Sequence, residues 1–318
     1  MIRVALLNSG GGWHLQRLRE AFMVAGAAAE PLPIPRLVGS AGRPTGAPPG
    51  PRSEAAEPPP LLHSAGQPLE AFDAVLVRVI PLGSLEQIIF RMDALHLLEA
   101  RGVPIFNPPR AIERTVDKFW TSAILDAAGV PTPPTAAAES FEDAMQAFRT
   151  LGGDLVVKPL FGSGGRGIVR VSDEDMAYRV FRTIEMHRWV YYLQRFVPHG
   201  TEDIRALVIG GRVTAACRRI GADWRTNVGR GAVTRPHLLT PVQEELALRA
   251  CKALEVEYAG VDLVDDEDGK TWVLEVNSIP GWSGLQETTP VDIASAIAAH
   301  VLERCGGAGR ARGRAAAG

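Results

Sequence analysis

Two carboxylates and one amide stand in apolar surroundings near the C-terminal end of the chain. Asp262 and Glu275 each lie within an apolar run, and Asn277 follows Glu275 by two positions. Asp268 and Gly269, between the two runs, are typical of a two-residue hairpin turn. That turn places Asp262 directly opposite Glu275. Asn277 then lies on the same face, because side chains alternate along a strand.

This arrangement predicts a cation site. Carboxylates that face each other repel unless a cation lies between them. Carboxylate and amide oxygens are ligands that Mg²⁺ prefers, and substrate phosphates complete its shell. We therefore expect Asp262, Glu275 and Asn277 to bind Mg²⁺. A solvated acidic face on a half-exposed hairpin is the alternative, and apolar neighbours such as Trp272 argue against it.

A glycine-rich segment follows the apolar run that ends at Lys158. Gly162, Gly164 and Gly167 match the spacing of a dinucleotide fingerprint, but that motif requires a helix directly afterwards. Residues 168–171 alternate like a strand, and the lysine and hydroxyl ending of a Walker A loop is missing. The loop therefore joins two strands. Its backbone amides can approach phosphates, with Lys158 as a nearby charge. A flexible hairpin with a surface lysine is the alternative.

Arginines concentrate in a glycine-punctuated stretch between these two features. Arg218 and Arg219 end an expected strand, and Arg225 is followed closely by Asn227. A guanidinium binds carboxylates and phosphates through paired hydrogen bonds, so the stretch predicts recognition of an anionic substrate. An RNA-binding patch and a solvated charged face are the alternatives. Acidic neighbours such as Asp223 keep the local charge mixed.

Apolar periodicity predicts the framework that positions these residues. Strands are expected over residues 2–7, 74–80 and 103–106, and helices over 13–25 and 85–100. A strand, a glycine turn and a helix in alternation are typical of α/β domains. The N-terminal part is therefore expected to form a small open parallel sheet.

Further helices are expected downstream. One is predicted over residues 112–128, two begin at capping boxes headed by Ser140 and Thr240, and the last covers 291–304. In contrast, ten of the thirty residues in 31–60 are proline. Such a segment excludes a helix or an interior strand, because each proline removes a backbone donor and fixes φ. We expect a long surface excursion there.

The composition limits the class of protein. A chain of 318 residues suggests two or three domains. The net charge of −2 argues against binding nucleic acid through the overall field. No apolar run reaches the roughly 18–20 residues of a membrane span, and the N-terminus lacks a signal-peptide pattern. The three cysteines are widely separated, which argues against a disulfide framework or a structural zinc site. These features predict a cytoplasmic protein without membrane or nucleic-acid partners.

The order of the motifs resembles the ATP-grasp superfamily and, within it, the RimK-type α-L-glutamate ligases. The resemblance covers roughly residues 115–293, and its most specific segments are 223–227, 274–281 and 287–293. It implies an α/β protein with an ATP-grasp fold of two α+β lobes. An N-terminal open parallel-sheet domain, of the kind called pre-ATP-grasp, would precede them.

The resemblance also implies domain boundaries. Residues 1–110 would form the N-terminal domain, including the proline-rich excursion 31–60. Residues 111–187 would form the small lobe with a glycine-rich lid, and residues 188–305 the large lobe with the metal site. A disordered tail would follow from 306 to 318.

Carried over by position, the resemblance assigns three groups of residues. Contacts to ATP are expected from Lys118, Lys158, Gly162, Ser163, Gly164, Gly165, Gln194, Arg195, Phe196, Val197 and Asp203. Within that group, residues 194–197 would read adenine and Asp203 would contact the ribose. The triphosphate and acyl phosphate would be held by Arg218 or Arg219, with Arg225 and Asn227. The metal ligands would be Asp262, Glu275 and Asn277, holding two Mg²⁺ ions, with Mn²⁺ as an alternative metal.

The implied activity is an ATP-dependent carboxylate–amine ligase that joins L-glutamate to a carboxylate acceptor through an acyl phosphate, releasing ADP and phosphate. The neutral N-terminal domain favours a small coenzyme such as tetrahydromethanopterin as acceptor. A protein tail, an amino-group carrier protein, another amino acid in place of glutamate, or a non-catalytic nucleotide-binding scaffold are the alternatives. Homo-oligomerisation is left open. Arg195 and Pro290 depart from residues common in the family.

Overall fold

The computed structural model describes residues 1–315 except 42–60, 163, 227–228 and 230. The chain forms two compact units: Met1–Pro109 with Ala294–Gly318, and Arg110–Ile293. The limit between the two units lies next to the boundary expected at residue 110. The expected small lobe, 111–187, and residues 188–293 of the expected large lobe lie in the second unit, whereas residues 294–305 of that lobe belong to the first. None of the described helices combines the length and the apolar character that a membrane span requires.

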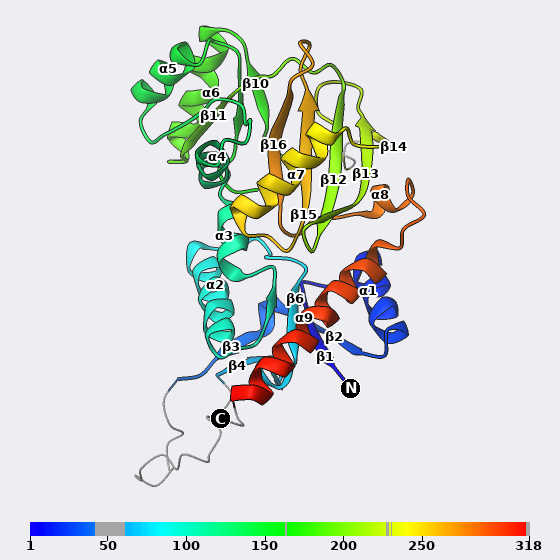
Figure 1. The fold of residues 1–318 in the computed structure, drawn as a ribbon. Helices are drawn as coiled ribbons and strands as arrows, with labels where there is room; N and C mark the ends of the chain where they lie inside the picture. The colour runs from blue at the N-terminus through cyan, green and yellow to red at the C-terminus, as the bar shows by residue number, and fades with distance from the viewer. Residues whose placement is uncertain (42–60, 163, 227–228, 230, 316–318) are drawn as a thin grey trace. The chain divides into compact units, whose positions relative to one another are not determined.

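The first unit is built on a parallel sheet in the order β2-β1-β6-β7 (Figure 1). Its strands are β1 (Arg3–Asn8), β2 (Ala28–Pro33), β6 (Ala74–Val77) and β7 (Ile105–Phe106). Four consecutive residues of β1, from Val4 to Leu7, are fully buried. The expected open parallel sheet is therefore confirmed, and its two interior strands, β1 and β6, are largely buried.

The longer helices of this unit, among its described residues, are α1 (Trp13–Val24), α2 (Leu85–Ala100) and α9 (Ile293–Ala315). Helix α9 packs against the sheet, with the ring of His300 5.8 Å from that of Phe106. The tail expected to be disordered from residue 306 instead continues helix α9 as far as Ala315. Residues 316–318 of that tail lie outside the described part.

The proline-rich segment was only partly anticipated. Its first residues complete β2, where Pro31 and Pro33 are tolerated because β2 is an edge strand. The short helix η1 (Ile34–Arg36) and strand β3 (Leu37–Gly39) follow. β3 joins a three-stranded antiparallel sheet whose other members are β4 (Leu62–Ser64) and β5 (Gln67–Pro68), followed by the short helix η2 (Leu69–Ala71). Residues 42–60 of the expected excursion lie outside the described residues.

The second unit contains an antiparallel sheet in the order β10-β9-β11-β8. Its strands are β8 (Thr135–Ala138), β9 (Leu155–Lys158), β10 (Val169–Val171) and β11 (Tyr191–Arg195). Helices α5 (Phe141–Thr150) and α6 (Glu174–Met186) cover one face, where Leu155 and Val157 enter a shared apolar core. Ser140 caps α5, as expected. Because side chains alternate, Val156 and Lys158 point to the opposite face.

The helix expected over residues 112–128 is in fact two helices, α3 (Pro109–Val116) and α4 (Lys118–Ala127). The break lies at Asp117, whose Oδ1 accepts a hydrogen bond of 2.9 Å from the backbone N–H of Trp120. Asp117 is therefore an N-cap inside a continuous apolar pattern. This cap makes Lys118 the first residue of a helix.

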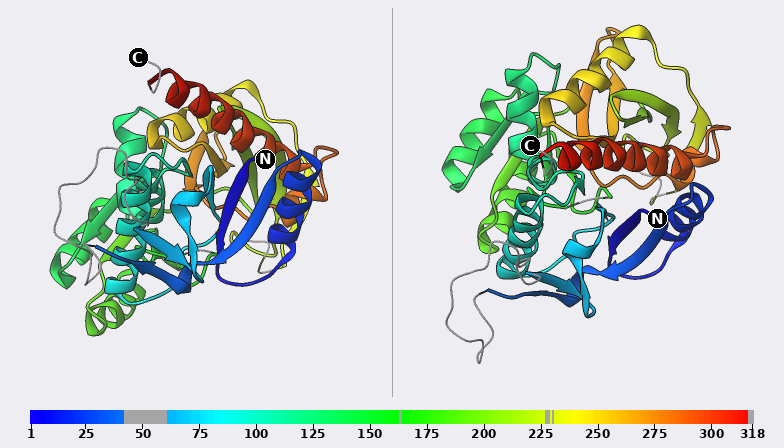
Figure 2. Two further views of the ribbon diagram at one scale, coloured as in Figure 1. Left: turned by 90° about the horizontal axis from the view of Figure 1, so that it is seen from below. Right: turned by 60° about the horizontal axis from the view of Figure 1, so that its bottom comes forward.

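The larger sheet of the second unit has the order β14-β13-β12-β15-β16 and is antiparallel. Its strands are β12 (Glu202–Ile209), β13 (Arg212–Ile220), β14 (Val233–Pro236), β15 (Tyr258–Asp265) and β16 (Thr271–Asn277). Helix α7 (Pro241–Leu254), which has the capping box expected at Thr240, packs on one face (Figures 1 and 2). Apolar side chains of β12, β15 and β16 form the core beneath it. The short helix α8 (Ser283–Gln286) follows β16.

Candidate active site

The face of the larger sheet that points away from α7 carries charged side chains. Arg205 of β12 lies directly opposite Asp262 of β15, and Asp262 lies opposite Glu275 of β16. Asp203 of β12 lies opposite Arg219 of β13. Residues of the other parity, such as Ile204 and Leu263, enter the core under α7. One face of the sheet is therefore apolar and packed, and the other presents a row of charges.

The predicted facing of Asp262 and Glu275 is confirmed, but the predicted turn is wrong. The strands close at Asp265 and Thr271, and Gly269 has a φ of 78°, so the loop is longer than two residues. Near the turn, the register therefore differs by one residue from the expected one. A β-bulge next to Asp262 inserts an extra residue and restores it. The carboxylates face each other because the two departures cancel.

Asp203, Arg219, Asp262 and Arg205 form a continuous charge network. Arg219 donates two hydrogen bonds to Asp203, of 2.7 and 2.5 Å. Its Nη2 also lies 3.0 Å from Oδ1 of Asp262, and Nε of Arg205 lies 2.8 Å from the same oxygen. The side chains of Asp203 and Arg219 are only 6% and 5% exposed. Both oxygens of Asp203, the residue expected to contact the ribose, therefore accept hydrogen bonds from Arg219.

Two lysines share the electrostatic field of these acids. Burial lowers the pKa of Lys158 to about 8, while Glu275 and Asp262 oppose that shift and Lys118 adds to it. Burial also lowers the pKa of Lys118, again opposed by Glu275. Nζ of Lys158 donates to Oε1 of Gln194 at 2.6 Å. The two predicted phosphate-binding lysines and the two predicted metal-binding carboxylates are thus close enough to influence one another.

The glycine-rich loop joins two antiparallel strands, β9 and β10, as predicted. Gly162, Gly164 and Gly165 have φ values of 146°, 71° and 68°, a region that favours glycine. The carbonyl of Gly162 accepts a hydrogen bond of 2.8 Å from Nζ of Lys118. Ser163, also expected in the site, lies outside the described residues. The loop therefore follows Lys158, the last residue of β9, and is hydrogen-bonded to Lys118.

The strand expected to read adenine runs beside an apolar cluster. Val197 is buried and packs with Val264 and Trp272, and the partly buried Leu274 packs against them. Val264 follows Asp262 by two positions, so this cluster lies on the same face as the carboxylates. A buried apolar cluster therefore lies beside the row of charges, and it includes Val197 of the segment expected to read adenine.

The other residues of the segment 194–197, which is expected to read adenine, have specific contacts. Gln194 is buried, and besides accepting from Lys158 its Nε2 donates to Thr135. Arg195 is exposed, and its backbone N–H bonds the carbonyl of Pro134. The ring of Phe196 is covered by the guanidinium of Arg170 at 3.6 Å. These contacts fix the strand against its neighbours.

The structure distinguishes the two adjacent arginines. Arg219 points to the charged face, whereas Arg218 has the opposite parity and pairs with Glu202 at 2.8 Å. Arg225 pairs with Asp223 at 2.6 Å. Asn227 lies outside the described residues. Of the three candidates that lie in the described part of the chain, Arg218, Arg219 and Arg225, Arg219 is the one brought to the acidic cluster.

Arg205 belongs to the arginine-rich stretch but was not among the predicted site residues, and it reaches the same carboxylate as Arg219. Its spacing was the available signal, because it follows Asp203 by two positions on one strand and must share its face. Cys217, opposite Arg205 on β13, is buried, and burial raises the pKa of its thiol to about 11. It is a neutral thiol on this face.

A metal at this face would depend on few protein ligands. Within the described residues, no group of three or more His, Cys, Asp or Glu side chains is placed to hold a metal. Asp262 and Glu275 supply two facing carboxylates. Oδ1 of Asn277 accepts a hydrogen bond of 2.9 Å from the backbone N–H of Ile279. Two carboxylates with an amide, completed by substrate oxygens, fit the shell that Mg²⁺ prefers.

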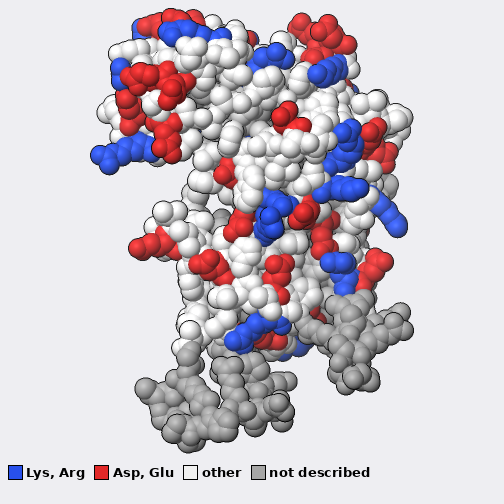
Figure 3. Space-filling view, turned by 60° about the vertical axis from the view of Figure 1, so that its left-hand side comes forward, with Lys and Arg blue, Asp and Glu red and all other residues white. Residues whose placement is uncertain are grey.

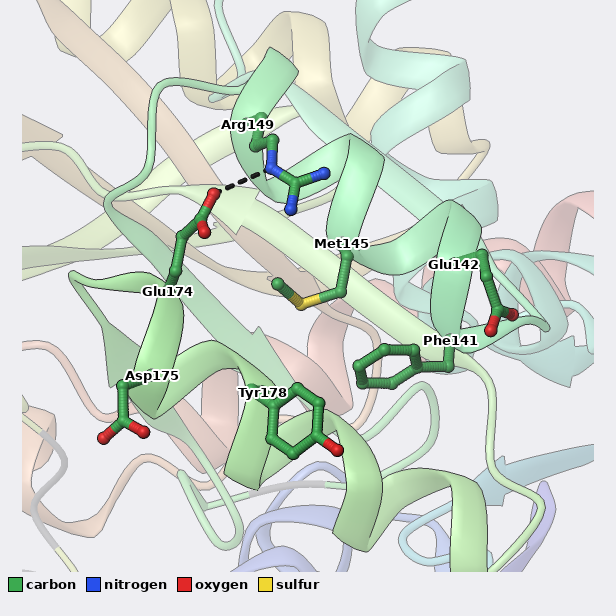
Figure 4. A pocket seen from close by; sticks show the side chains of 7 residues that line it. All are labelled: Phe141, Glu142, Met145, Arg149, Glu174, Asp175 and Tyr178. Carbon is green, nitrogen blue, oxygen red and sulfur yellow. Dashed lines mark hydrogen bonds and ion pairs between the residues drawn. The ribbon is translucent and has the colours of Figure 1, made fainter.

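The described part of the second unit has a cavity on its helical layer and another beside the charged face. A shallow one of about 550 Å³ lies between α5 and α6 (Figure 4). Its lining residues are Phe141, Glu142, Met145, Arg149, Glu174, Asp175 and Tyr178. It lies on the helical layer, on the opposite side of the small sheet from Lys158. A smaller cavity of about 310 Å³, lined in part by His199, Asp203 and Val264, adjoins the charged face. The larger cavity is therefore remote from the candidate chemistry.

On the surface drawn in Figure 3, acidic and basic side chains of the described residues are interspersed. This distribution agrees with the net charge of −2. The surface in that view therefore offers mixed charge rather than a single basic field.

Comparison with known proteins identifies the family. The model of the RimK-like ATP-grasp domain matches residues 115–301. A tetrahydromethanopterin:α-L-glutamate ligase of Methanocaldococcus jannaschii is 37% identical over 242 residues, which cover 74% of this chain and 81% of that protein. The enzyme of the same name from Methanosarcina acetivorans is 32% identical over 274 residues, covering 77% and 84%.

A solved structure supports the same fold. The ATP-grasp ligase PsnB, in complex with a minimal precursor, Mg and ADP, has a TM-score of 0.70 at 19% identity, covering 95% of this chain and 98% of that one. At that identity the likeness concerns the fold alone. The expected ATP-grasp fold is confirmed. With a family model that spans more than half of its length, the chain belongs to the RimK-like ATP-grasp family.

Proposed function

We propose that the protein is an ATP-dependent ligase that joins L-glutamate to the carboxylate of a small coenzyme of the tetrahydromethanopterin type. The observation that carries this proposal is the facing pair Asp262 and Glu275 within the field of Lys118 and Lys158. Such a cluster suits phosphoryl transfer, which depends on neutralising charge and on positioning. The names and coverage of the two archaeal relatives supply the substrate class.

Asp262, Glu275 and Asn277 are the proposed ligands of Mg²⁺. When bound, the ion supplies charge neutralisation between the phosphates and the two carboxylates. Glu275 is partly exposed and forms no ion pair among the described residues, so its carboxylate is open to a ligand. Two ions, and Mn²⁺ as a substitute, remain part of the proposal.

Lys118 and Lys158 are proposed to bind the phosphates of ATP. The backbone of residues 162–165 would cover them, and residues 194–197 with the apolar cluster around Val264 would receive the adenine. Asp203 is proposed to orient Arg219 through their paired hydrogen bonds. Arg219 would then stabilise the charge of the transferred phosphoryl group.

The proposed reaction has two steps. A carboxylate oxygen of the acceptor attacks the γ-phosphorus of ATP, the bond to the bridging oxygen breaks, and ADP leaves. The amine nitrogen of L-glutamate then attacks the acyl carbon, and phosphate leaves as the amide forms. The ammonium proton goes to solvent or to the departing phosphate. Closure of the glycine-rich loop would exclude water from the acyl phosphate.

The test is turnover of purified protein with ATP, Mg²⁺, L-glutamate and tetrahydromethanopterin, with ADP release and product mass as readouts. We expect ADP release that requires both glutamate and the acceptor. Glu275→Gln should abolish it, because the substitution removes the charge but keeps the shape of the side chain. Glu303→Gln, an exposed glutamate of α9, is the matched control and should retain full activity.

Activity of Glu275→Gln above about one-tenth of the wild-type rate would contradict the assigned role of this carboxylate. The acceptor is tested separately, by a mass-spectrometric search of a cell extract for molecules that gain a glutamyl unit. A glutamylated coenzyme is the expected result. A glutamylated protein instead would replace the coenzyme in the proposal by a protein tail or a carrier protein.

A further inference from the structure

Arg205 lies in a narrow slot that a glycine leaves open. Gly260 precedes Asp262 by two positions on β15 and therefore shares its face. A Cβ added to Gly260 would overlap Nη1 of Arg205 and lie 3.1 Å from its Cδ and Cζ. The φ of Gly260 is not in the left-handed region, so an alanine could adopt its backbone conformation. The space over Gly260, rather than its backbone, is what the guanidinium requires.

The slot directs Arg205 to the carboxylate that we propose as a metal ligand. Nε of Arg205 lies 2.8 Å from Oδ1 of Asp262, and the two side chains are 16% and 9% exposed. Nη1 of Arg205 is buried and forms no hydrogen bond within the described residues. The ion pair with Asp262 is therefore a principal polar contact of this guanidinium.

The same oxygen of Asp262 is also 3.0 Å from Nη2 of Arg219. Arg219 is held by its two bonds to Asp203, so it cannot leave without breaking a buried pair. Arg205 has no second carboxylate partner among the described residues. Of the two cations on Asp262, Arg205 is the one that can move away.

We propose that Arg205 is a positioning residue that holds Asp262 in place and makes binding of a divalent cation depend on the nucleotide. With two guanidiniums on Asp262, a cation alone meets a carboxylate that is already neutralised, and it binds weakly. Triphosphate brings the negative charge that offsets Arg205, so cation and nucleotide bind together. Gly260 is required because it leaves room for Arg205. This inference rests on the proposed function of the site.

The test is a double-mutant cycle on Mn²⁺ binding without nucleotide, followed by electron paramagnetic resonance of the free ion. The variants are Arg205→Met, Gly260→Ala and the double variant. Arg205→Met should tighten Mn²⁺ binding by about tenfold, because a positive charge beside the site is lost. Gly260→Ala should tighten it in the same direction by displacing Arg205. The double variant should match Arg205→Met alone, since the alanine then has no arginine to displace.

A second measurement compares Mn²⁺ affinity with and without a non-hydrolysable ATP analogue. The analogue should strengthen Mn²⁺ binding more in the wild type than in Arg205→Met. Arg205→Lys keeps the charge and should stay close to the wild type. Arg212→Met removes an exposed arginine from the same sheet and should leave Mn²⁺ binding unchanged. Far-UV circular dichroism checks that each variant is folded.

Unchanged or weaker Mn²⁺ binding in folded Arg205→Met would overturn the inference, as would effects of the two substitutions that simply add. If Arg205→Met does not fold, Gly260→Ala with Arg205→Lys decides the question through the same affinity. The outcome is separable from the proposed function. A wild-type protein that turns over glutamate and acceptor, but shows additive Mn²⁺ effects, refutes only the role of Arg205. If the two substitutions are coupled in Mn²⁺ binding but the wild type does not turn over glutamate and acceptor, only the proposed reaction is refuted.

Discussion

The lowered pKa of Lys158 predicts how nucleotide affinity depends on pH. Burial brings this pKa to about 8, from an ordinary 10.5, so the free protein loses the charge of Lys158 in a mildly alkaline buffer. About nine-tenths of the molecules carry the charge at pH 7 and about one-tenth at pH 9. A bound triphosphate stabilises the charged form, so binding must restore the missing proton. The affinity for nucleotide should therefore fall about tenfold from pH 7 to pH 9.

The assay is isothermal titration with a non-hydrolysable ATP analogue at fixed Mg²⁺, in buffers of different ionisation enthalpy. At pH 8.5, binding should take up about three-quarters of a proton. Lys158→Arg keeps its charge throughout this range, so its affinity should vary little with pH. Lys252→Arg, at an exposed position of α7, is the matched control and should behave like the wild type.

The same shift has a consequence for stability. Between pH 8 and 10.5 the unfolded chain binds more protons at this lysine than the folded protein does. The contribution of Lys158 to the free energy of unfolding should therefore rise with pH over that window. The free energy of unfolding is measured against pH for the wild type and for Lys158→Met, and the difference between the two curves gives the contribution of Lys158. An affinity for the analogue that stays flat from pH 7 to pH 9, or release of protons on binding, would refute the reasoning.

Two further predictions concern stability, measured by urea unfolding. Arg219→Met should lower the free energy of unfolding by about 3–5 kcal/mol, because Asp203 is left buried without its cation, and the double variant with Asp203→Asn should recover part of the loss. A loss below about 1 kcal/mol would contradict the importance of this pair. Thr240→Ala should cost about 1 kcal/mol by removing the N-cap of α7, whereas Thr240→Ser should be close to wild type; equal stability of all three proteins would contradict the cap.

Local patterns in the sequence were sufficient for most of the framework. Apolar periodicity located β1, β6 and β7 of the N-terminal sheet but not β2. The capping signals at Ser140 and Thr240 marked the starts of α5 and α7, with the full capping box formed at Thr240. These signals depend on residues that are close together in the sequence, so they can be recognised without knowing the fold. The predictions were wrong where a short signal, such as a helix cap, lies within a longer apolar pattern. Asp117 interrupts an apolar helical pattern because its side chain caps the next helix.

The hairpin that carries Asp262 and Glu275 has one feature that the sequence predicted and two that it did not. Alternation and the Asp-Gly pair predicted that the two carboxylates lie opposite each other, but through a two-residue turn that the structure does not have. The length of the turn and the bulge beside Asp262 could not be read from the sequence, because a bulge depends on how two strands pack together. The prediction of facing carboxylates was confirmed although its turn was wrong.

By itself, the sequence determined which residue types could do chemistry and on which kind of element each lies, because those properties depend on side-chain identity and on periods of two or 3.6 residues. Only the tertiary structure decided which partners meet. Arg219, rather than Arg218, reaches Asp262 because β13 pairs with β12 in one register. Arg205 lies over Gly260, far away in the chain, because β12 lies beside β15. Such contacts join residues that are distant in sequence, and no local pattern carries that information.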